Sequence, residues 1–391
     1  MRFFASGPLG FENKLIEEFQ SFWFLMIDLD GLPTRSVPPE MKVLEGGIEF
    51  ETEMHLGLQI NFFTKIAYRI LLRSHHFSAR YYDQLEKNLA RMNFDAFFKK
   101  QTPITFKIST AKSRVNNEKN ILEVCHKVFS KSGYEIKDTA EQEIFLRIFK
   151  DEVEISMDCS GEHLHKRGYR QFQSEAPIRE NLAALMWMFL PMTVGAHDVI
   201  VDPFCGSGTL LFEFLIRSKP NFSRPYPFLK WGNCPAIVKS PTFSKNFHFL
   251  NGESEVYKLI GCDIDGSALE KAKKNLELLR TQYALHSTVE FVHSNCNAVK
   301  IAPSPRQNLV VVANPPYGER LDDKNSIQDL TKFIENRSAQ YKKIVLMMLQ
   351  PQQRVPEIST LGLISKIPFN NQGLKLNLLI YSNERNIKID F

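Results

Sequence analysis

A short apolar, β-branched run at residues 199–201 is followed directly by a glycine-rich turn and then by the apolar stretch LLFEFLI. A buried strand, a glycine turn and a helix in this order are typical of domains that bind nucleotide-like ligands at the ends of parallel strands. The turn spans residues 202–209 and reads DPFCGSGT. Leu211 stands where the dinucleotide fingerprint has its third glycine, so the sequence argues against a nicotinamide cofactor.

The same alternation of strands and helices continues to the end of the chain. Five apolar runs predict parallel strands, and helical patterns such as KAKKNLELL separate them; the runs read VIVD, LIGCD, EFVHS, LVVVAN and KIVLMML. ISKIPF and LKLNLLIY, with NNQG between them, predict a closing hairpin. The predicted fold is therefore α/β, a Rossmann-like and mostly parallel seven-stranded sheet with an antiparallel last strand.

The first half of the chain has a different pattern. Helical spacing covers residues 57–72 and 79–98, PITFKIST alternates like a strand, and EIFLRIFKDEVEISMDCSG predicts a hairpin. This mixture predicts an α+β region. In the second half, residues 217–256 are rich in Pro, Phe and Lys, and we expect them to form an insertion at the surface near the functional site.

A second motif, NPPY, follows the strand run LVVVAN and consists of Asn314, Pro315, Pro316 and Tyr317. The exocyclic amine of a purine is a poor nucleophile because its lone pair is delocalised into the ring. The Asn314 amide oxygen and the Pro315 carbonyl are two acceptors that can take both N–H hydrogens and so localise that pair. Tyr317 supplies a flat face on which a base stacks, an interaction worth about 1–3 kcal/mol. With the glycine turn upstream, the motif predicts methyl transfer by positioning of two reactants, whereas Asn-Pro-Pro alone is also compatible with a simple turn.

Two aspartates stand at predicted strand ends. Asp263 closes the run KLIGCD and is placed to accept hydrogen bonds from both hydroxyls of a ribose, or it is an ordinary turn residue. Asp202 is placed to meet a cationic amino group, and its alternative role is to cap the following helix.

Charge is distributed unevenly around the net value of +5. Residues 1–162 hold 21 basic and 24 acidic side chains, a balance of −3, whereas residues 163–391 hold 28 and 20, a balance of +8. Two local runs are basic: residues 99–119 contain one acid, and residues 163–170 contain none and carry an aromatic, Tyr169. Such runs track a phosphate backbone, although the second is also compatible with a charged interdomain linker.

Length and composition limit the remaining classes. At 391 residues the chain is expected to contain two or three domains. Its longest apolar stretches are too short to span a bilayer, and its start has no signal-peptide pattern. The six cysteines form no CxxC pair and the histidines form no HExxH motif. We therefore expect no membrane partner, no metal and a cytoplasmic location.

Taken in order, the motifs resemble a known family. They are FFASGPLGFENKLIEE, LEGGIEFE, DCSGEHLHKRGYR, APIRENLAA, DPFCGSGT, GCDID and NPPYGERL. The chain resembles the bacterial class I RNA methyltransferases with an amino-terminal THUMP domain, and it is similar to the 23S ribosomal RNA guanine-N2 methyltransferases. Some relatives carry the label "putative adenine-specific DNA methylase". The resemblance covers nearly the whole chain.

The resemblance implies S-adenosylmethionine as the methyl donor, with the catalytic residues in NPPY. The implied cofactor-binding residues are Asp202, Pro203, Phe204, Cys205, Gly206, Ser207, Gly208, Thr209, Asp263, Ile264, Asn295 and Asn314. Ile264 would pack against the adenine. Asn295 stands where relatives usually have an aspartate that reads the adenine amino group; an amide oxygen still accepts that hydrogen bond, so binding is expected to be weakened rather than lost.

The resemblance also implies a domain order and a partner. Residues 1–50 would form a ferredoxin-like piece, residues 51–162 a THUMP RNA-binding domain, and residues 163–391 the methyltransferase domain. The partner would be RNA, in the first place large-subunit ribosomal RNA. The candidate RNA-binding residues, taken from the two basic runs, are Lys112, Arg114, Lys166, Arg167 and Arg170.

Three hypotheses follow. The first is methylation of an exocyclic purine amine in RNA, with guanine N2 of 23S ribosomal RNA as the preferred target. The second keeps the chemistry but acts on adenine N6 in DNA; NPPY is shared by both classes, and the THUMP-like half favours RNA. The third is a catalytically silent RNA-binding assembly factor, which the intact NPPY motif disfavours and a failure to bind cofactor would favour.

Overall fold

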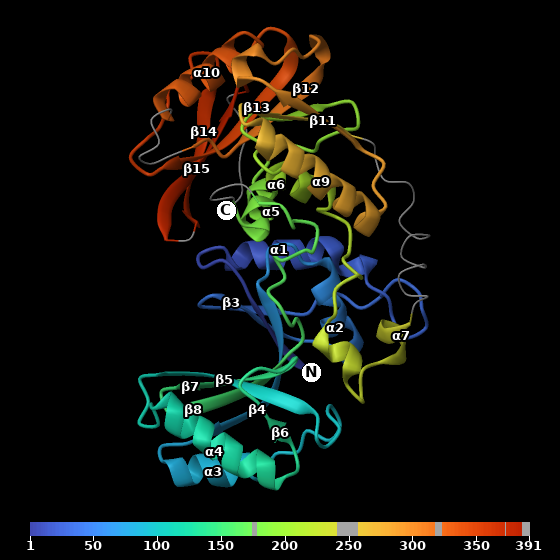
Figure 1. The fold of residues 1–391 in the computed structure, drawn as a ribbon, viewed down its shortest axis with the longest axis vertical. Coiled ribbons are helices and arrows are strands. Elements are labelled where there is room, and N and C mark those ends of the chain that lie inside the picture. Colours follow the sequence, from blue (N-terminus) through green and yellow to red (C-terminus); the bar gives the residue numbers. More distant parts are fainter. Residues whose placement is uncertain (174–177, 241–256, 317–322, 372, 385–391) are drawn as a thin grey trace. The chain divides into compact units, whose positions relative to one another are not determined.

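The computed structural model describes residues 1–173, 178–240, 257–316, 323–371 and 373–384 (Figure 1). The chain divides into two compact units. Unit 1 holds residues 1–164 and the described part of 222–251, and unit 2 holds the described parts of 165–221 and 252–391. Within the described residues, none of the helices combines the length and the apolar character that crossing a membrane requires.

Unit 1 is built on an eight-stranded sheet in the order β2-β3-β1-β4-β8-β7-β5-β6. Its elements are β1 (Arg2–Ser6), α1 (Glu12–Phe22), η1 (Trp23–Leu25), β2 (Met41–Leu44), β3 (Gly47–Glu51), α2 (Met54–Phe63), β4 (Arg69–Ser78), α3 (Tyr82–Leu89), β5 (Pro103–Ala111), α4 (Glu118–Lys131), β6 (Glu135–Ile136), β7 (Gln142–Phe149) and β8 (Glu152–Asp158). One sheet therefore contains strands from residues 1–50, predicted as a ferredoxin-like piece, and from residues 51–162, predicted as a THUMP domain. The boundary between these two domains stays a prediction.

The helix predicted over residues 57–72 is wrong at its end. Helix α2 stops at Phe63, and β4 begins at Arg69. Ile70 and Leu72 are buried while their neighbours are only half-buried, which is the period of two that a strand requires. Because β4 pairs with β1 on one side and β8 on the other, sheet pairing prevails over the helical spacing.

The first part of the predicted insertion, residues 222–240, belongs to the core of unit 1. It contains η2 (Pro227–Lys230) and α7 (Ala236–Lys239). The indole Nε1 of Trp231 donates to Gln142 Oε1 at 2.9 Å, and the Tyr226 hydroxyl donates to the carbonyl of Asn61 at 3.2 Å. Both aromatic side chains are buried. The expected surface excursion is therefore wrong for these residues.

Unit 2 is built on a seven-stranded sheet in the order β11-β10-β9-β12-β13-β15-β14. Its elements are α5 (Glu180–Met188), β9 (Val199–Asp202), α6 (Thr209–Leu215), β10 (Lys258–Asp263), α9 (Gly266–Tyr283), β11 (Thr288–His293), η3 (Cys296–Ala298), β12 (Ser304–Ala313), α10 (Asp323–Glu335), β13 (Tyr341–Pro351), β14 (Gly362–Asn371) and β15 (Leu374–Ser382). Strands β9 to β13 pair in parallel and β15 pairs antiparallel with β13. The predicted strands and the antiparallel last strand are confirmed.

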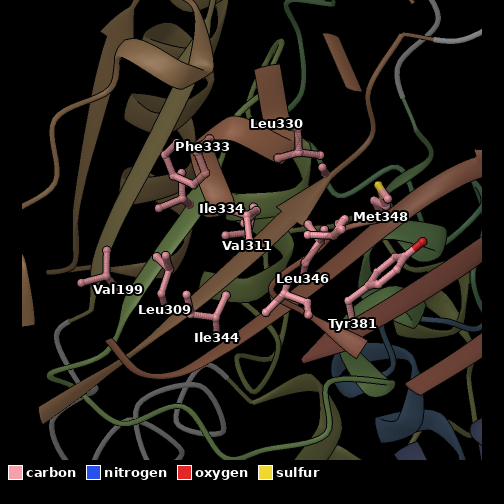
Figure 2. Packing of buried hydrophobic residues seen from close by; sticks show 14 of the residues in the cluster. Val199, Leu309, Val311, Leu330, Phe333, Ile334, Ile344, Leu346, Met348 and Tyr381 are labelled. Carbon is pink, nitrogen blue, oxygen red and sulfur yellow. The ribbon is translucent and has the colours of Figure 1, made fainter. Parts of the chain in front are cut away.

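The core of unit 2 fixes the central strands. Figure 2 shows side chains of β12 and β13, including Val311 and Leu346, packed with Phe333 of α10. Along β12 the residues alternate between the two faces of the sheet, yet Val310, Val311 and Val312 are all fully buried. A strand that is covered on both faces reads as a continuous apolar run, as LVVVAN does. This burial fixes the register of β9 and β12, so that the two strands end at the same edge of the sheet.

Candidate functional site

The predicted site residues meet at the carboxyl edge of the parallel strands. Strand β9 pairs with β12 in the register Val201 to Val311, so Asp202 and the Asn314 loop follow side by side. Strand β10 lies on the other side of β9, and Asp263 is its last residue. In open α/β sheets ligands bind outside this edge. Segments distant in the sequence therefore contribute to one site.

The glycine-rich loop between β9 and α6 is tied to β10. Cys205 N donates to the carbonyl of Cys262 at 2.9 Å, and Gly206 N donates to Asp263 Oδ2 at 2.8 Å. Gly208 has a φ of +90°, and a Cβ on it would lie 2.4 Å from the Phe212 ring. Only glycine fits there without displacement of the ring. The loop thus holds its backbone close to the strand ends, as the sequence predicts.

Asp202 is a buried carboxylate with one hydrogen bond to a backbone N–H, from Phe204 at 3.0 Å. Burial raises the pKa of Asp202 well above its ordinary value; the Phe204 N–H opposes this rise, and the nearby Asp263 carboxylate adds to it. Burial makes the ionised carboxylate of Asp202 unfavourable, and a cationic partner would stabilise it. The ammonium group of an amino-acid ligand fits that requirement, which is consistent with the role predicted for Asp202.

The other predicted cofactor residues differ in exposure. Asp263 is half-buried, and its Oδ1 accepts a hydrogen bond from Asp265 N at 2.9 Å. A carboxylate has about four lone-pair directions, so both oxygens retain capacity for hydroxyl donors. Ile264 is 67% exposed, which leaves its side chain available for an apolar contact.

The amide of Asn295 is held by an acid that the sequence does not reveal. Its Nδ2 donates to Asp329 Oδ2 at 2.7 Å, and its Oδ1 accepts from Asn297 N at 3.1 Å. Asn297 Nδ2 donates to the other oxygen of the same carboxylate at 2.8 Å. Asp329 on α10 therefore fixes the orientation of Asn295. It lies on an amphipathic helix far along the chain, where an acid normally marks a solvated face, so no sequence signal distinguishes it.

The NPPY motif is described up to Pro316. The Oδ1 atom of Asn314 is buried and has no hydrogen-bond partner among the described residues. Pro315 is buried and Pro316 is half-buried. Tyr317 lies outside the described residues. A buried acceptor without a partner is costly, and it fits a site whose donor is the amine of a bound substrate.

The predicted RNA contacts at residues 163–170 need correction. Lys166 is exposed, but Arg167 is only 2% exposed and Tyr169 is fully buried. Arg170 Nε lies 3.0 Å from Glu180 Oε1 and its side chain is 10% exposed. Arg167 is buried, and Arg170 is held by Glu180 and by the carbonyl of Ile178. Side chains held within the fold in this way do not track a phosphate backbone, so the prediction of RNA contacts is wrong for Arg167 and Arg170. In the other run, Lys112 and Arg114 are exposed.

Arg167 and Tyr169 instead converge on one acid of α6. Arg167 Nη2 donates to Glu213 Oε2 at 3.2 Å, and the Tyr169 hydroxyl donates to Glu213 Oε1 at 2.9 Å. Burial by itself lowers the pKa of Arg167, but Glu213, together with Tyr283 and Glu180, raises it, and the net shift is upward. The sequence contains a signal for the ion pair of Arg167 with Glu213. An acid within the apolar stretch LLFEFLI is expected to be buried, and a buried acid needs a partner.

The sheet with its antiparallel β15, the glycine turn after β9 and the Asn-Pro-Pro turn after β12 define a class I methyltransferase domain. Residues 167–377 match the family model described as "RMKL-like, methyltransferase domain". This match covers more than half of the sequence, so the chain belongs to that family. The family assignment supports S-adenosylmethionine, predicted from the sequence, as the methyl donor.

Individual proteins agree with this assignment. A "Ribosomal RNA large subunit methyltransferase K/L" of Colwellia psychrerythraea is 27% identical over 351 residues, which cover 86% of this chain and 48% of the relative. A crystal structure titled "a possible methylase from Clostridium difficile 630" is 26% identical, with a TM-score of 0.74 and 97% of both chains covered. The structure of SMU.472 "complexed with SAH" is 21% identical with a TM-score of 0.75 and 97% of both chains covered; it shows the fold alone.

The length of the curated relatives limits what their names say about this chain. The chain spans about half the length of the ribosomal RNA methyltransferases it matches, 48% in one and 43% in another. Their activities and substrates therefore describe longer proteins.

Replacement of Arg167 by Met is expected to lower the free energy of unfolding by about 3–5 kcal/mol, because Glu213 would remain buried without its counterion. The added change Glu213→Leu should restore most of that loss. Lys166→Met, at an exposed neighbour, should change stability by less than about 0.5 kcal/mol. Urea unfolding of the three variants measures this, and equal losses for Arg167→Met and Lys166→Met would refute the buried ion pair.

The raised pKa of Asp202 predicts pH-dependent cofactor binding. A ligand ammonium needs the ionised carboxylate, and the raised pKa keeps Asp202 protonated up to a higher pH than an ordinary aspartate. Affinity for S-adenosylhomocysteine should therefore rise with pH and level off above the raised pKa. Asp202→Asn should bind more weakly and lose this dependence. Calorimetric titrations at several pH values measure both, and the same pH dependence in the variant would contradict the assignment.

Proposed function

We propose that the chain transfers a methyl group from S-adenosylmethionine to an exocyclic amine of a purine in RNA, with guanine N2 of 23S ribosomal RNA as the preferred target. Asp202, the backbone of residues 203–209 and Asp263 would bind the cofactor. Asn314 and the Pro315 carbonyl would accept the two amine hydrogens, and Tyr317 would stack on the base. Ile264 and Asn295 would contact the cofactor's adenine.

The observation that carries this proposal is that the Oδ1 of Asn314 has no hydrogen-bond partner within the part of the chain that the structure describes. This atom is buried among the described residues, at the strand edge that also holds Asp202. It offers an acceptor but no proton-accepting base, which suits an amine whose lone pair must be localised rather than an alcohol that must be deprotonated. Catalysis by this arrangement depends on positioning, and it requires the target base to leave its stack.

Two observations support RNA as the substrate class. The relatives matched over most of this chain are named as ribosomal RNA methyltransferases. Unit 1 also carries an open hollow of about 510 Å³ whose lining has four exposed cations and two acids, namely Arg80, Lys87, Arg91 and Lys150 with Asp151 and Glu152. Basic side chains around a hollow suit a phosphate backbone. We propose that this half contains the ferredoxin-like piece and the THUMP domain.

The predicted contacts Lys112 and Arg114 adjoin the same surface. Lys112 and Lys150, which lines the hollow, both lie over the ring of Phe149. Arg114 N donates to Asp151 Oδ1 at 2.8 Å, and Asp151 is part of the lining of the hollow. The Arg114 guanidinium also lies over the ring of Tyr81, which is 53% exposed. Cations next to an exposed aromatic ring can bind phosphate and stack a base together, so we retain both residues, with Lys166, as proposed RNA contacts.

Asn314→Ala is expected to reduce methyl transfer at saturating cofactor by at least about 100-fold, the loss typical for one group that stabilises a transition state. Affinity for S-adenosylhomocysteine should stay nearly unchanged. Asn308→Ala, earlier on the same strand, is the matched control and should remain active. Single-turnover methylation with labelled cofactor measures the rate. An active Asn314→Ala protein would refute the proposed chemistry.

Charge reversal at Lys87, Arg91 and Lys150 should weaken the binding of RNA whatever its sequence, and it should make the affinity for RNA less dependent on salt. Each lost phosphate contact lowers the slope of log affinity against log salt by about 0.7–0.9, so a combined change of about 2–3 is expected. Lys230→Glu, exposed in unit 1 but not part of the hollow's lining, is the control. Filter binding at a series of salt concentrations tests this, and an unchanged slope would assign RNA binding to another surface.

A further inference from the structure

Asn275 on α9 joins three segments of unit 2 through one fully buried amide. Its Oδ1 accepts from Phe172 N at 3.1 Å, and its Nδ2 donates to the carbonyl of Phe172 at 2.7 Å. The same Nδ2 donates to the carbonyl of Ser207 at 3.3 Å. The amide thereby connects α9, the segment 165–173 and the glycine-rich loop.

The bonding of Asn275 leaves little choice of residue. Its amide pairs with the backbone of Phe172 through one donor and one acceptor, as a peptide group would. The second amide hydrogen is then directed at Ser207, so both donors are used. Aspartate has the same size but no donor, and leucine has a similar shape but no polar atom. An asparagine is therefore required for this set of bonds, and the bonds compensate for the complete burial of its amide.

The Ser207 carbonyl belongs to the half of the loop that the β10 bonds do not reach. Cys205 and Gly206 are fixed by β10. Beyond them, the peptide of Ser207 precedes Gly208, whose left-handed conformation begins α6. The Ser207 hydroxyl is buried and has no partner among the described residues. Among the hydrogen bonds described for this second half, the one from the Asn275 amide comes from a side chain outside the loop.

We infer that Asn275 is a positioning residue for the cofactor: its amide holds the Ser207–Gly208 peptide in the orientation that S-adenosylmethionine binds. This inference rests on the proposed function, in which residues 202–209 contact the cofactor. Asn275 would not touch the cofactor itself. It acts through the loop, and it joins the loop to the segment 165–173 by the same side chain.

The test compares Asn275→Leu with Asn221→Leu. Asn221 is 4% exposed, and its Nδ2 donates to the carbonyl of Arg167 at 3.1 Å while its Oδ1 accepts from Gln282 at 3.1 Å. It is thus a buried amide bound to the same segment 165–173, and none of these bonds involves the glycine-rich loop. Loss of either amide should lower the unfolding midpoint, but only loss of Asn275 should affect cofactor binding.

For Asn275→Leu we expect the KM for S-adenosylmethionine and the Kd for S-adenosylhomocysteine to rise about tenfold, which is the value of one hydrogen bond. The kcat at saturating cofactor should stay within about twofold of wild type. In the cofactor-free protein, the amide hydrogens of residues 207–209 should exchange faster. Asn275→Ala, which removes the same bonds and leaves space instead of bulk, is measured beside it.

The outcomes separate the two proposals. If the wild-type chain binds S-adenosylhomocysteine and both Asn275 variants bind it with the same Kd, the positioning role alone is overturned. An equal rise in Kd for Asn275→Leu and Asn221→Leu would also overturn it, because the effect would follow from stability. A wild-type chain that binds neither S-adenosylmethionine nor S-adenosylhomocysteine would overturn the proposed function and the positioning role with it.

Discussion

The parallel pairing of β9 with β10 on one side and β12 on the other is the constraint on which the site depends. Its register brings the ends of three strands to one edge, so that Asp202, Asp263 and Asn314 lie together although they are far apart in the sequence. The core packed around β12 and β13 keeps that register fixed. The hydrogen bond from Gly206 N to Asp263 then joins the glycine-rich loop to the neighbouring strand.

Buried polar groups at this edge fall into two kinds. Glu213 is satisfied within the fold by Arg167 and Tyr169, and this group holds the segment 165–173 against α6. The Asn314 amide oxygen and the Ser207 hydroxyl are buried without partners among the described residues. Unsatisfied groups reduce stability, and they gather at functional sites where a ligand completes their hydrogen bonds. In the proposed function, the substrate amine meets the Asn314 amide oxygen, and the Ser207 hydroxyl belongs to the cofactor-binding loop.

Sequence patterns predicted unit 2 well because its central strands, such as β9 and β12, contain apolar runs buried on both faces, and its loops carry unusual residues such as Gly208 and Pro315. They failed where tertiary contacts decide the outcome. The run 163–170 has the composition of a solvated basic surface, but Arg167 is buried in an ion pair with Glu213, which lies on another element, α6. Residues 69–72 continue a helical spacing until pairing with β1 and β8 is known. Asn275 and Asp329 look like ordinary polar positions of amphipathic helices, because their partners come from distant segments.

The central claim is transfer of a methyl group to an exocyclic purine amine. Its most direct test is incubation of the chain with labelled S-adenosylmethionine and 23S ribosomal RNA from cells that lack its gene, followed by mass spectrometry of the nucleosides. The account predicts label in N2-methylguanosine. Label in N6-methyladenosine would retain the amine chemistry but overturn the guanine target. Label on a ribose or a base carbon, or no label from a chain that binds the cofactor, would contradict the central claim.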